Sequence, residues 1–160
     1  MIDWNLLRQL SETPGVSGDE DRVRELLLSA VRPLADEVAV TPLGCVIAKK
    51  RGKRRAAVPV MLCAHMDEPG FLVTRIGEDG LLRLAPVGAV PPGTLCGRPV
   101  TVCTAKGEIP GVLGAKPVHL LTAEERKKPV EAKDLLLDIG ALDAAEARRA
   151  AAPGDRVVFT

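Results

Sequence analysis

Hydrophobic residues near the start of the chain recur at the spacing of helices. One helix face is formed by Ile2, Leu6, Leu7 and Leu10. Pro14-Gly15 then breaks the pattern, and Ser17 to Glu20 has the form of a capping box, in which the Ser17 hydroxyl accepts from the amide of Glu20. Behind this cap the helical period is kept by Val23, Leu26, Leu27, Ala30, Val31 and Leu34. The pattern predicts two helices, the second capped by Ser17.

The period then changes to that of strands. Short strands are expected at 38–40 and 45–48, around a turn at Thr41 to Gly44. The run from Val58 to Ala64 is almost entirely apolar, which is typical of a strand covered on both faces in a central parallel sheet. Cys63 lies within it and is expected to be a buried free thiol. The first 68 residues therefore predict the beginning of an α/β domain.

After Gly70 the apolar runs become shorter and turns more frequent. Glu78-Asp79-Gly80 and Lys106-Gly107 are hairpin turn signals. The expected elements are a hairpin of strands 71–76 and 81–85, a hairpin of strands 98–104 and 109–113, a strand at 135–139, a helix at 141–152 and a strand at 156–159. This spacing favours a small β-rich module. We expect a boundary near residue 69, dividing the chain into domains of residues 1–69 and 70–160.

Composition narrows the functional classes. The 160 residues include 22 Lys and Arg against 21 Asp and Glu, so no overall charge attracts nucleic acid or an anionic membrane. Only 2% of residues are aromatic, so the core must be aliphatic. No apolar run approaches the ~20 residues that span a bilayer. No signal peptide is visible, and we expect a cytoplasmic protein.

Two local features could indicate other functions, namely nucleic-acid binding and a cysteine-based zinc or redox site. The basic segment 49–55 contains no aromatic residue to stack on a base, and its Gly52 indicates a turn, so a solvated turn is favoured over a nucleic-acid site. The four cysteines form no C-x-x-C pair, which argues against a zinc ribbon or a redox motif.

The segment from Cys63 to Gly70 carries the candidate chemistry. There the expected buried strand ends in His65, Asp67 and Glu68, and ligand sites of open α/β sheets lie at the carboxyl ends of strands. His65 can offer a neutral imidazole to a divalent metal, while Asp67 holds the other ring nitrogen. The alternative is a hydrogen-bonded strand end without metal. The second histidine, His119, lies in a proline-containing loop and is interpreted as a structural or surface residue.

Several short motifs extend along almost the whole chain. They are Pro14 to Gly18 with Glu20, Pro42 to Gly44, Ala64 to Glu68, Gly107 to Val112, Gly114 to Pro117, His119 to Thr122, Glu124 to Lys128, Asp138 to Gly140, and Pro153 to Asp155. In order and spacing they resemble the tetrahedral aminopeptidases, which include glutamyl and deblocking aminopeptidases and are sometimes labelled endoglucanases.

The resemblance implies an α/β zinc-peptidase-like catalytic domain interrupted by a β-rich, PDZ-like dimerisation domain. It further implies two divalent metal ions, zinc or cobalt, release of N-terminal residues from peptides, and assembly of dimers into hollow dodecamers. His65 would be a metal ligand, and Asp67 would hold the His65 ring at the catalytic site.

In that family the other metal ligands and the general-base glutamate follow later in the chain. This chain would therefore carry one metal ligand, and we expect it to be inactive by itself. Two hypotheses stay open. The chain is either a metalloaminopeptidase homologue, which is truncated or is completed by a second polypeptide carrying the missing half, or a non-catalytic dimerisation or assembly module. Nucleic-acid binding through 49–55 is a distant third.

Overall fold

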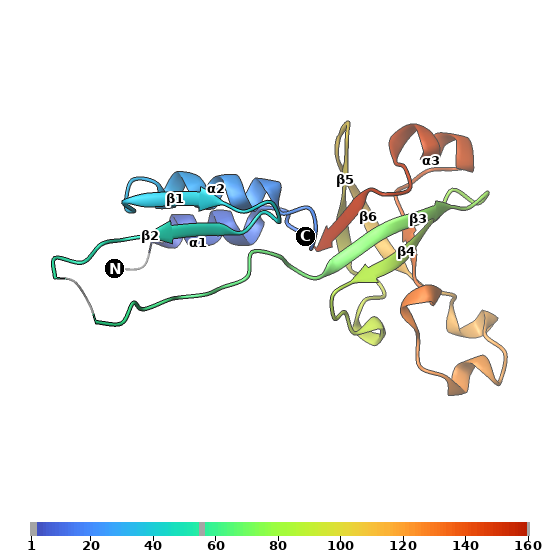
Figure 1. The fold of residues 1–160 in the computed structure, drawn as a ribbon. Coiled ribbons are helices and arrows are strands. Elements are labelled where there is room, and N and C mark those ends of the chain that lie inside the picture. The colour runs from blue at the N-terminus through green and yellow to red at the C-terminus, as the bar shows by residue number, and fades with distance from the viewer. Residues whose placement is uncertain (1–2, 55–56, 160) are drawn as a thin grey trace. The chain divides into compact units, whose positions relative to one another are not determined.

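The structure is a computed structural model that describes residues 3–54 and 57–159 (Figure 1). By its contacts the chain divides into two compact units, Met1–Asp67 and Glu68–Thr160. None of the described helices is long and apolar enough to cross a membrane.

The first unit begins with the two expected helices. Helix α1 covers Trp4–Glu12, and its N-cap Asp3 accepts hydrogen bonds from the amides of Asn5 and Leu6 at 3.0 and 3.1 Å. Helix α2 covers Asp21–Val31. Both helices are confirmed, although Ile2, which we had placed in the first, lies outside the described residues, and Leu34, which we had placed in the second, lies beyond its end at Val31.

The predicted capping box is wrong. Helix α2 begins at Asp21, and its N-cap is Glu20, which makes no side-chain cap. Gly18 has a φ of 85°, which no helical residue adopts, so the helix cannot start directly after Ser17. The Glu20 carboxylate instead accepts from the Gly18 amide at 2.7 Å, and the Ser17 hydroxyl donates to Asp67. Ser17 therefore does not cap α2, and its hydroxyl bonds a residue that lies far along the chain.

The two short strands form the expected hairpin. Strands β1 (Glu37–Val40) and β2 (Val46–Lys49) pair antiparallel, with Glu37 opposite Lys49 and Val40 opposite Val46. Gly44 closes the turn with a φ of 86°, a conformation that favours glycine.

The central strand predicted at 58–64 does not form. The segment has no strand pairing, and Val60 and Leu62 are 88% and 92% exposed. Cys63 is exposed too, so the expectation of a buried thiol is also wrong. A strand buried on both faces needs neighbours on either side, and the only sheet among the described residues of this unit is the two-stranded β1–β2. The apolar run is therefore left uncovered.

The second unit is a closed antiparallel barrel in the order β3-β4-β7-β6-β5-β8. Its strands are β3 (Gly70–Ile76), β4 (Leu82–Val87), β5 (Pro99–Thr104), β6 (Gly107–Gly114), β7 (Leu136–Asp138) and β8 (Arg156–Phe159). Helix α3 covers Ala144–Ala150, and short 3-10 turns cover η1 (Pro92–Thr94), η2 (Val118–Leu120), η3 (Glu125–Lys127) and η4 (Ala132–Asp134). Both predicted hairpins, the strand near 135–139, the helix and the last strand are confirmed.

The barrel closes through its last strand. Strand β8 pairs with β3, where Phe71 faces Val157, and with β5, where Val102 faces the same Val157. Inward side chains are aliphatic, as the composition required, apart from Phe71, whose ring meets Phe159 edge-on at 5.9 Å. Hairpin signals are local and predicted the pairs, whereas closure depends on residues about 85 positions apart and was not predicted.

Candidate functional site

The candidate residues His65 and Asp67 lie in the last part of the first unit, directly after the exposed apolar run. The His65 side chain is 84% exposed, and the Asp67 side chain is 36% exposed. The imidazole is therefore accessible, while the carboxylate is partly covered by the protein.

The Nδ1 atom of His65 is held by Asp67. It lies 2.8 Å from the Asp67 backbone carbonyl oxygen and 3.2 Å from the carboxylate Oδ1. A carbonyl oxygen can only accept, so Nδ1 carries the proton in this arrangement. In the neutral ring the lone pair is then on Nε2, the atom that could bind a divalent metal.

The Asp67 carboxylate has a second partner, which sequence reasoning missed. The Ser17 hydroxyl donates to Oδ2. This hydrogen bond is the main cause that holds the pKa of Asp67 below its usual range; burial opposes it, while the Asp67 amide and the nearby His65 add to it. Asp67 therefore stays ionised and presents negative charge to the ring that it orients. Ser17 belongs to the motif of Pro14 to Gly18, but its neighbours resembled a helix cap, and no local signal pointed to Asp67.

The turn that carries Ser17 is packed tightly onto helix α2. A Cβ atom on Gly15 would lie only 2.6 Å from the Val23 Cγ2 atom, so this position needs glycine. Val16 and Val23 are 1% and 4% exposed and anchor the turn. The small core of the first unit thus positions the hydroxyl that reaches Asp67.

The described residues near His65 can supply one metal ligand, but they do not form a complete metal centre. Within residues 3–54 and 57–159, no three His, Cys, Asp or Glu side chains come together in a way that could hold a metal ion. His119 lies exposed in η2 of the second unit, as a structural or surface residue would. Zinc sites in proteins use three or four protein ligands. His65 with its Asp67 partner can supply one of them.

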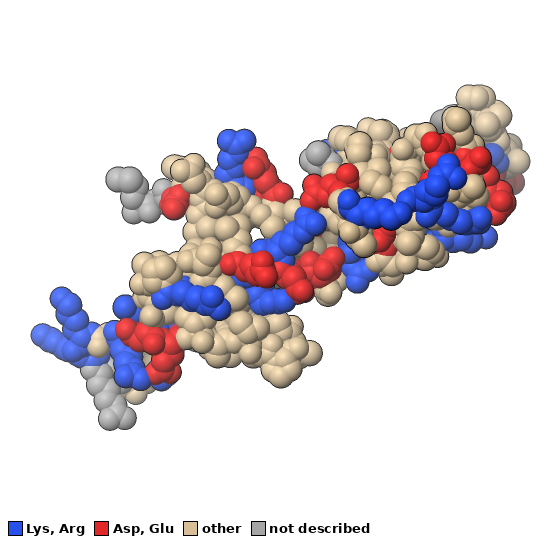
Figure 2. All heavy atoms as spheres, turned by 90° about the horizontal axis from the view of Figure 1, so that it is seen from above, with Lys and Arg blue, Asp and Glu red and all other residues tan. Residues whose placement is uncertain are grey.

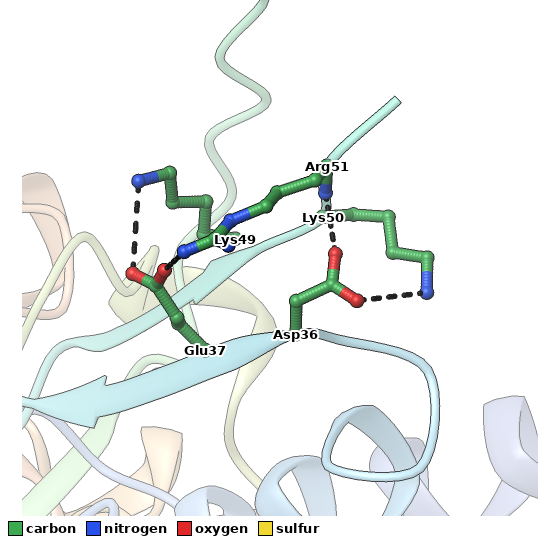
Figure 3. Close-up of polar contacts among 5 residues, drawn as sticks. All are labelled: Asp36, Glu37, Lys49, Lys50 and Arg51. Carbon is green, nitrogen blue, oxygen red and sulfur yellow. Dashed lines mark hydrogen bonds and ion pairs between the residues drawn. The ribbon is translucent and has the colours of Figure 1, made fainter. Parts of the chain in front are cut away.

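Three of the basic side chains at the end of β2 and directly after it contact two acids, Asp36 and Glu37. Glu37 pairs with Arg51 and, at 3.6 Å, with Lys49 (Figure 3). Asp36 accepts from the Arg51 amide at 2.5 Å and pairs with Lys50 at 3.5 Å. The pKa of each acid is lowered, mainly by its contact with Arg51. On the face in Figure 2, most Lys and Arg side chains likewise lie beside Asp and Glu, which supports the solvated-turn interpretation.

Comparison with known proteins finds one family that matches the loop carrying His65 and Asp67 together with the barrel unit. The model of the M42 glutamyl aminopeptidase family matches residues 44–160, which include His65, Asp67 and the whole barrel unit. The family is one of peptidases, a class of hydrolases. The chain belongs to the M42 glutamyl aminopeptidase family.

Individual relatives agree with this assignment. A lysyl aminopeptidase of Pyrococcus furiosus is 40% identical over 149 residues, which are 92% of this chain and 42% of that protein. The TET aminopeptidase from the marine sediment archaeon Thaumarchaeota archaeon SCGC AB-539-E09 superposes with a TM-score of 0.89 at 38% identity, over 97% of this chain and 44% of its own. The match shows that this chain has the α/β fold of these solved structures.

A third relative is an oligomer. The TET1 peptidase of Pyrococcus horikoshii, which can assemble into a tetrahedron or a large octahedral shell, has a TM-score of 0.81 at 37% identity, over 98% of this chain and 46% of its own. The chain therefore spans less than half the length of the relatives that it matches.

Proposed function

We propose that this chain forms part of a metal-dependent aminopeptidase that hydrolyses N-terminal residues from peptides. The observation that carries the proposal is the orientation of His65, whose Nδ1 is held by Asp67 so that Nε2 is left to bind a metal. The segment Ala64 to Glu68 that contains both residues lies within the match to the family.

In this proposal the metal centre contains two divalent ions, zinc or cobalt. When bound, such ions acidify a water molecule and polarise the scissile carbonyl group. His65 contributes one ligand. Asp67 fixes the ring and, being ionised, makes the imidazole a stronger electron donor. The Ser17 hydroxyl donates to the Asp67 carboxylate and lowers its pKa.

We assign residues 1–69 to the catalytic domain and residues 70–160 to a PDZ-like dimerisation domain. Two observations support this division. The barrel closes on itself and encloses its own core, including Leu113 and Leu137, which are fully buried. The TET1 peptidase relative assembles into large shells, which supports homo-oligomerisation here.

We also propose that the 160-residue chain is inactive by itself. A single histidine with one carboxylate is too few ligands for two metals, and the described residues contain no group of three His, Cys, Asp or Glu side chains that could hold a metal ion. The exposed run at 58–64 supports completion of the α/β sheet by further polypeptide, because Val60 and Leu62 lack the cover that their apolar character requires.

Calorimetric titration with zinc and with cobalt tests the assignment of His65. The wild-type chain should bind weakly, and His65→Ala should remove that binding, whereas His119→Ala serves as a matched control and should leave it unchanged. Asp67→Asn should weaken the binding about 10- to 100-fold, as expected for the partner of a ligating histidine. Metal binding that is indifferent to His65→Ala would contradict the assignment.

The alternative function is a non-catalytic dimerisation or assembly module. The self-contained barrel favours it, because this unit needs no metal for its core. Two measurements separate the two functions: light scattering of the full chain in EDTA tests for a dimer that forms without metal, and the calorimetric titration without EDTA tests for metal binding at His65. A stable dimer that binds no metal at His65 would favour the module, while metal binding dependent on His65 favours the enzyme.

A further inference from the structure

The segment that carries His65 has no regular secondary structure of its own. Residues 57–67 contain neither a helix nor a strand, and the His65 side chain is 84% exposed. An exposed imidazole on such a segment can adopt several rotamers and both neutral tautomers. The orientation of the ring therefore depends on the contacts that it makes with neighbouring groups.

Asp67 uses both of its carboxylate oxygens in this arrangement. Oδ1 lies 3.2 Å from His65 Nδ1, and Oδ2 accepts the hydrogen bond from the Ser17 hydroxyl. The backbone carbonyl oxygen of Asp67 adds a second contact to Nδ1, at 2.8 Å. Asp67 thus lies between the serine and the ring, and a rotation of its carboxylate away from His65 would break the bond to Ser17.

The turn that presents Ser17 is packed against helix α2 and passes close to the segment of His65. A Cβ atom on Gly15 would lie 2.6 Å from Val23 Cγ2, and 3.7 Å from the Met66 backbone carbonyl oxygen. The backbone of the turn therefore lies next to the residue that follows His65. This close approach brings the Ser17 hydroxyl within reach of the carboxylate.

Hydrogen bonds on either side of Ser17 hold the turn in its conformation. The Asp19 amide donates to the Val16 carbonyl oxygen at 2.8 Å, and the Gly18 amide donates to the Glu20 carboxylate at 2.7 Å. Val16 is 1% exposed, so the turn is also fixed by apolar burial. Ser17 therefore offers its hydroxyl from a well-held position, which the segment of His65 does not provide for itself.

We propose that Ser17 is a positioning residue for His65, an inference that rests on the proposed function of His65 as a metal ligand. By bonding Oδ2, the Ser17 hydroxyl turns that oxygen toward the turn and keeps Oδ1 beside the ring. Asp67 is thereby restricted to holding Nδ1, and His65 presents the lone pair of Nε2 to the metal. Ser17 acts on the ring through Asp67.

A serine with a merely structural role would tie the two segments together without affecting the ring. The two roles differ in how Ser17 and Asp67 are coupled. The effect of a structural serine on metal affinity would add to the effect of Asp67, whereas a positioning serine has no effect once the Asp67 carboxylate is removed.

The first test uses the metal-free 160-residue chain. In the His119→Ala background, where His65 is the remaining histidine, NMR of the ring nitrogens at about pH 9 reports the tautomer of the neutral imidazole. The ring should carry its proton on Nδ1. Ser17→Ala should give a mixture of tautomers, and Ser17→Thr, which keeps a hydroxyl, should restore the Nδ1 form. Ser29→Ala, whose hydroxyl bonds the Leu26 carbonyl oxygen, is the control and should change nothing.

The second test is calorimetric titration with zinc. Ser17→Ala should weaken zinc binding about tenfold, the lower end of the loss expected when the partner of a ligating histidine is disturbed. In the Asp67→Asn background the same substitution should cause no further loss. Ser17→Thr should again restore the affinity.

Three results would overturn the proposal: a ring that carries its proton on Nε2 in the chain with Ser17, a tautomer unchanged by Ser17→Ala, or losses of zinc affinity that add in the double variant. Circular dichroism verifies the fold of each variant, and the first of these results needs no substitution of Ser17. A chain that binds no zinc at His65 would refute the proposed function, whereas the tautomer is measured without metal and decides separately whether Ser17 orients the ring.

Discussion

The Ser17 hydroxyl donates a hydrogen bond to the Asp67 carboxylate across 50 positions of sequence. This contact joins the turn before α2 to the loop that carries His65. It also lowers the pKa of Asp67 more than any other interaction does. The pH at which the residue that orients His65 becomes protonated therefore depends on a serine whose sequence context resembles a helix cap.

Removal of the Ser17 hydroxyl should raise the pKa of Asp67 toward its ordinary value. The lowered pKa means that Asp67 stabilises the fold at pH values above its unfolded pKa and loses that contribution as the pH falls through its folded pKa. Ser17→Ala should shift this loss to higher pH. An NMR titration of the Asp67 carboxyl carbon in EDTA measures the shift, and Ser29→Ala, whose hydroxyl bonds the Leu26 carbonyl oxygen on α2, is the control. An unchanged titration in Ser17→Ala would contradict this assignment.

Glu125 should titrate far below the ordinary pKa of a glutamate. Its pKa is lowered from 4.5 to about 2, chiefly by the Thr122 amide and then by Lys116. The contribution of this contact to stability is fully present above about pH 4.5 and is lost as the pH falls through about 2. The Thr122 amide proton should report a midpoint near 2 by NMR, and Glu125→Gln should remove the transition. Glu124→Gln should leave it in place; a midpoint at the ordinary value would show that the contact is absent in solution.

Truncation inside the barrel should destabilise the second unit strongly. Leu137 is fully buried on β7, between β4 and β6. Leu137→Ala should lower the free energy of unfolding by about 2–5 kcal/mol, through lost apolar burial and the cavity left behind. Urea denaturation followed by circular dichroism measures the change. Leu142→Ala, at a position that is 89% exposed, should change stability little. Similar losses at both positions would mean that the barrel core is not packed as described.

The exposed run at 58–64 should cause self-association rather than stabilise this chain. Leu62 is 92% exposed. Leu62→Asp should alter the free energy of unfolding by no more than about 0.5 kcal/mol. It should also reduce aggregation in light scattering, because it interrupts an exposed apolar surface. Leu113→Asp, which buries a carboxylate in the barrel, should unfold that unit. A large loss of stability in Leu62→Asp would show that the segment is covered after all.

Local patterns predicted the parts of the fold that depend on near neighbours. The turn signals at Glu78 to Gly80 and at Lys106-Gly107 correctly indicated the β3–β4 and β5–β6 hairpins, because a turn sets the register of the strands that it joins. The apolar run at 58–64 was assigned wrongly for a related reason. A continuous apolar run specifies a need for cover on both faces, but it does not supply the strands that provide the cover.

The sequence by itself determined the helices, the hairpins, the aliphatic core and the pairing of His65 with Asp67, since each depends on residues close together in the chain. Only the tertiary structure decided that Ser17 reaches Asp67 and that β8 closes the barrel. These relationships join residues that are far apart in the chain. Their formation depends on packing that brings distant segments together, for which a local pattern contains no signal.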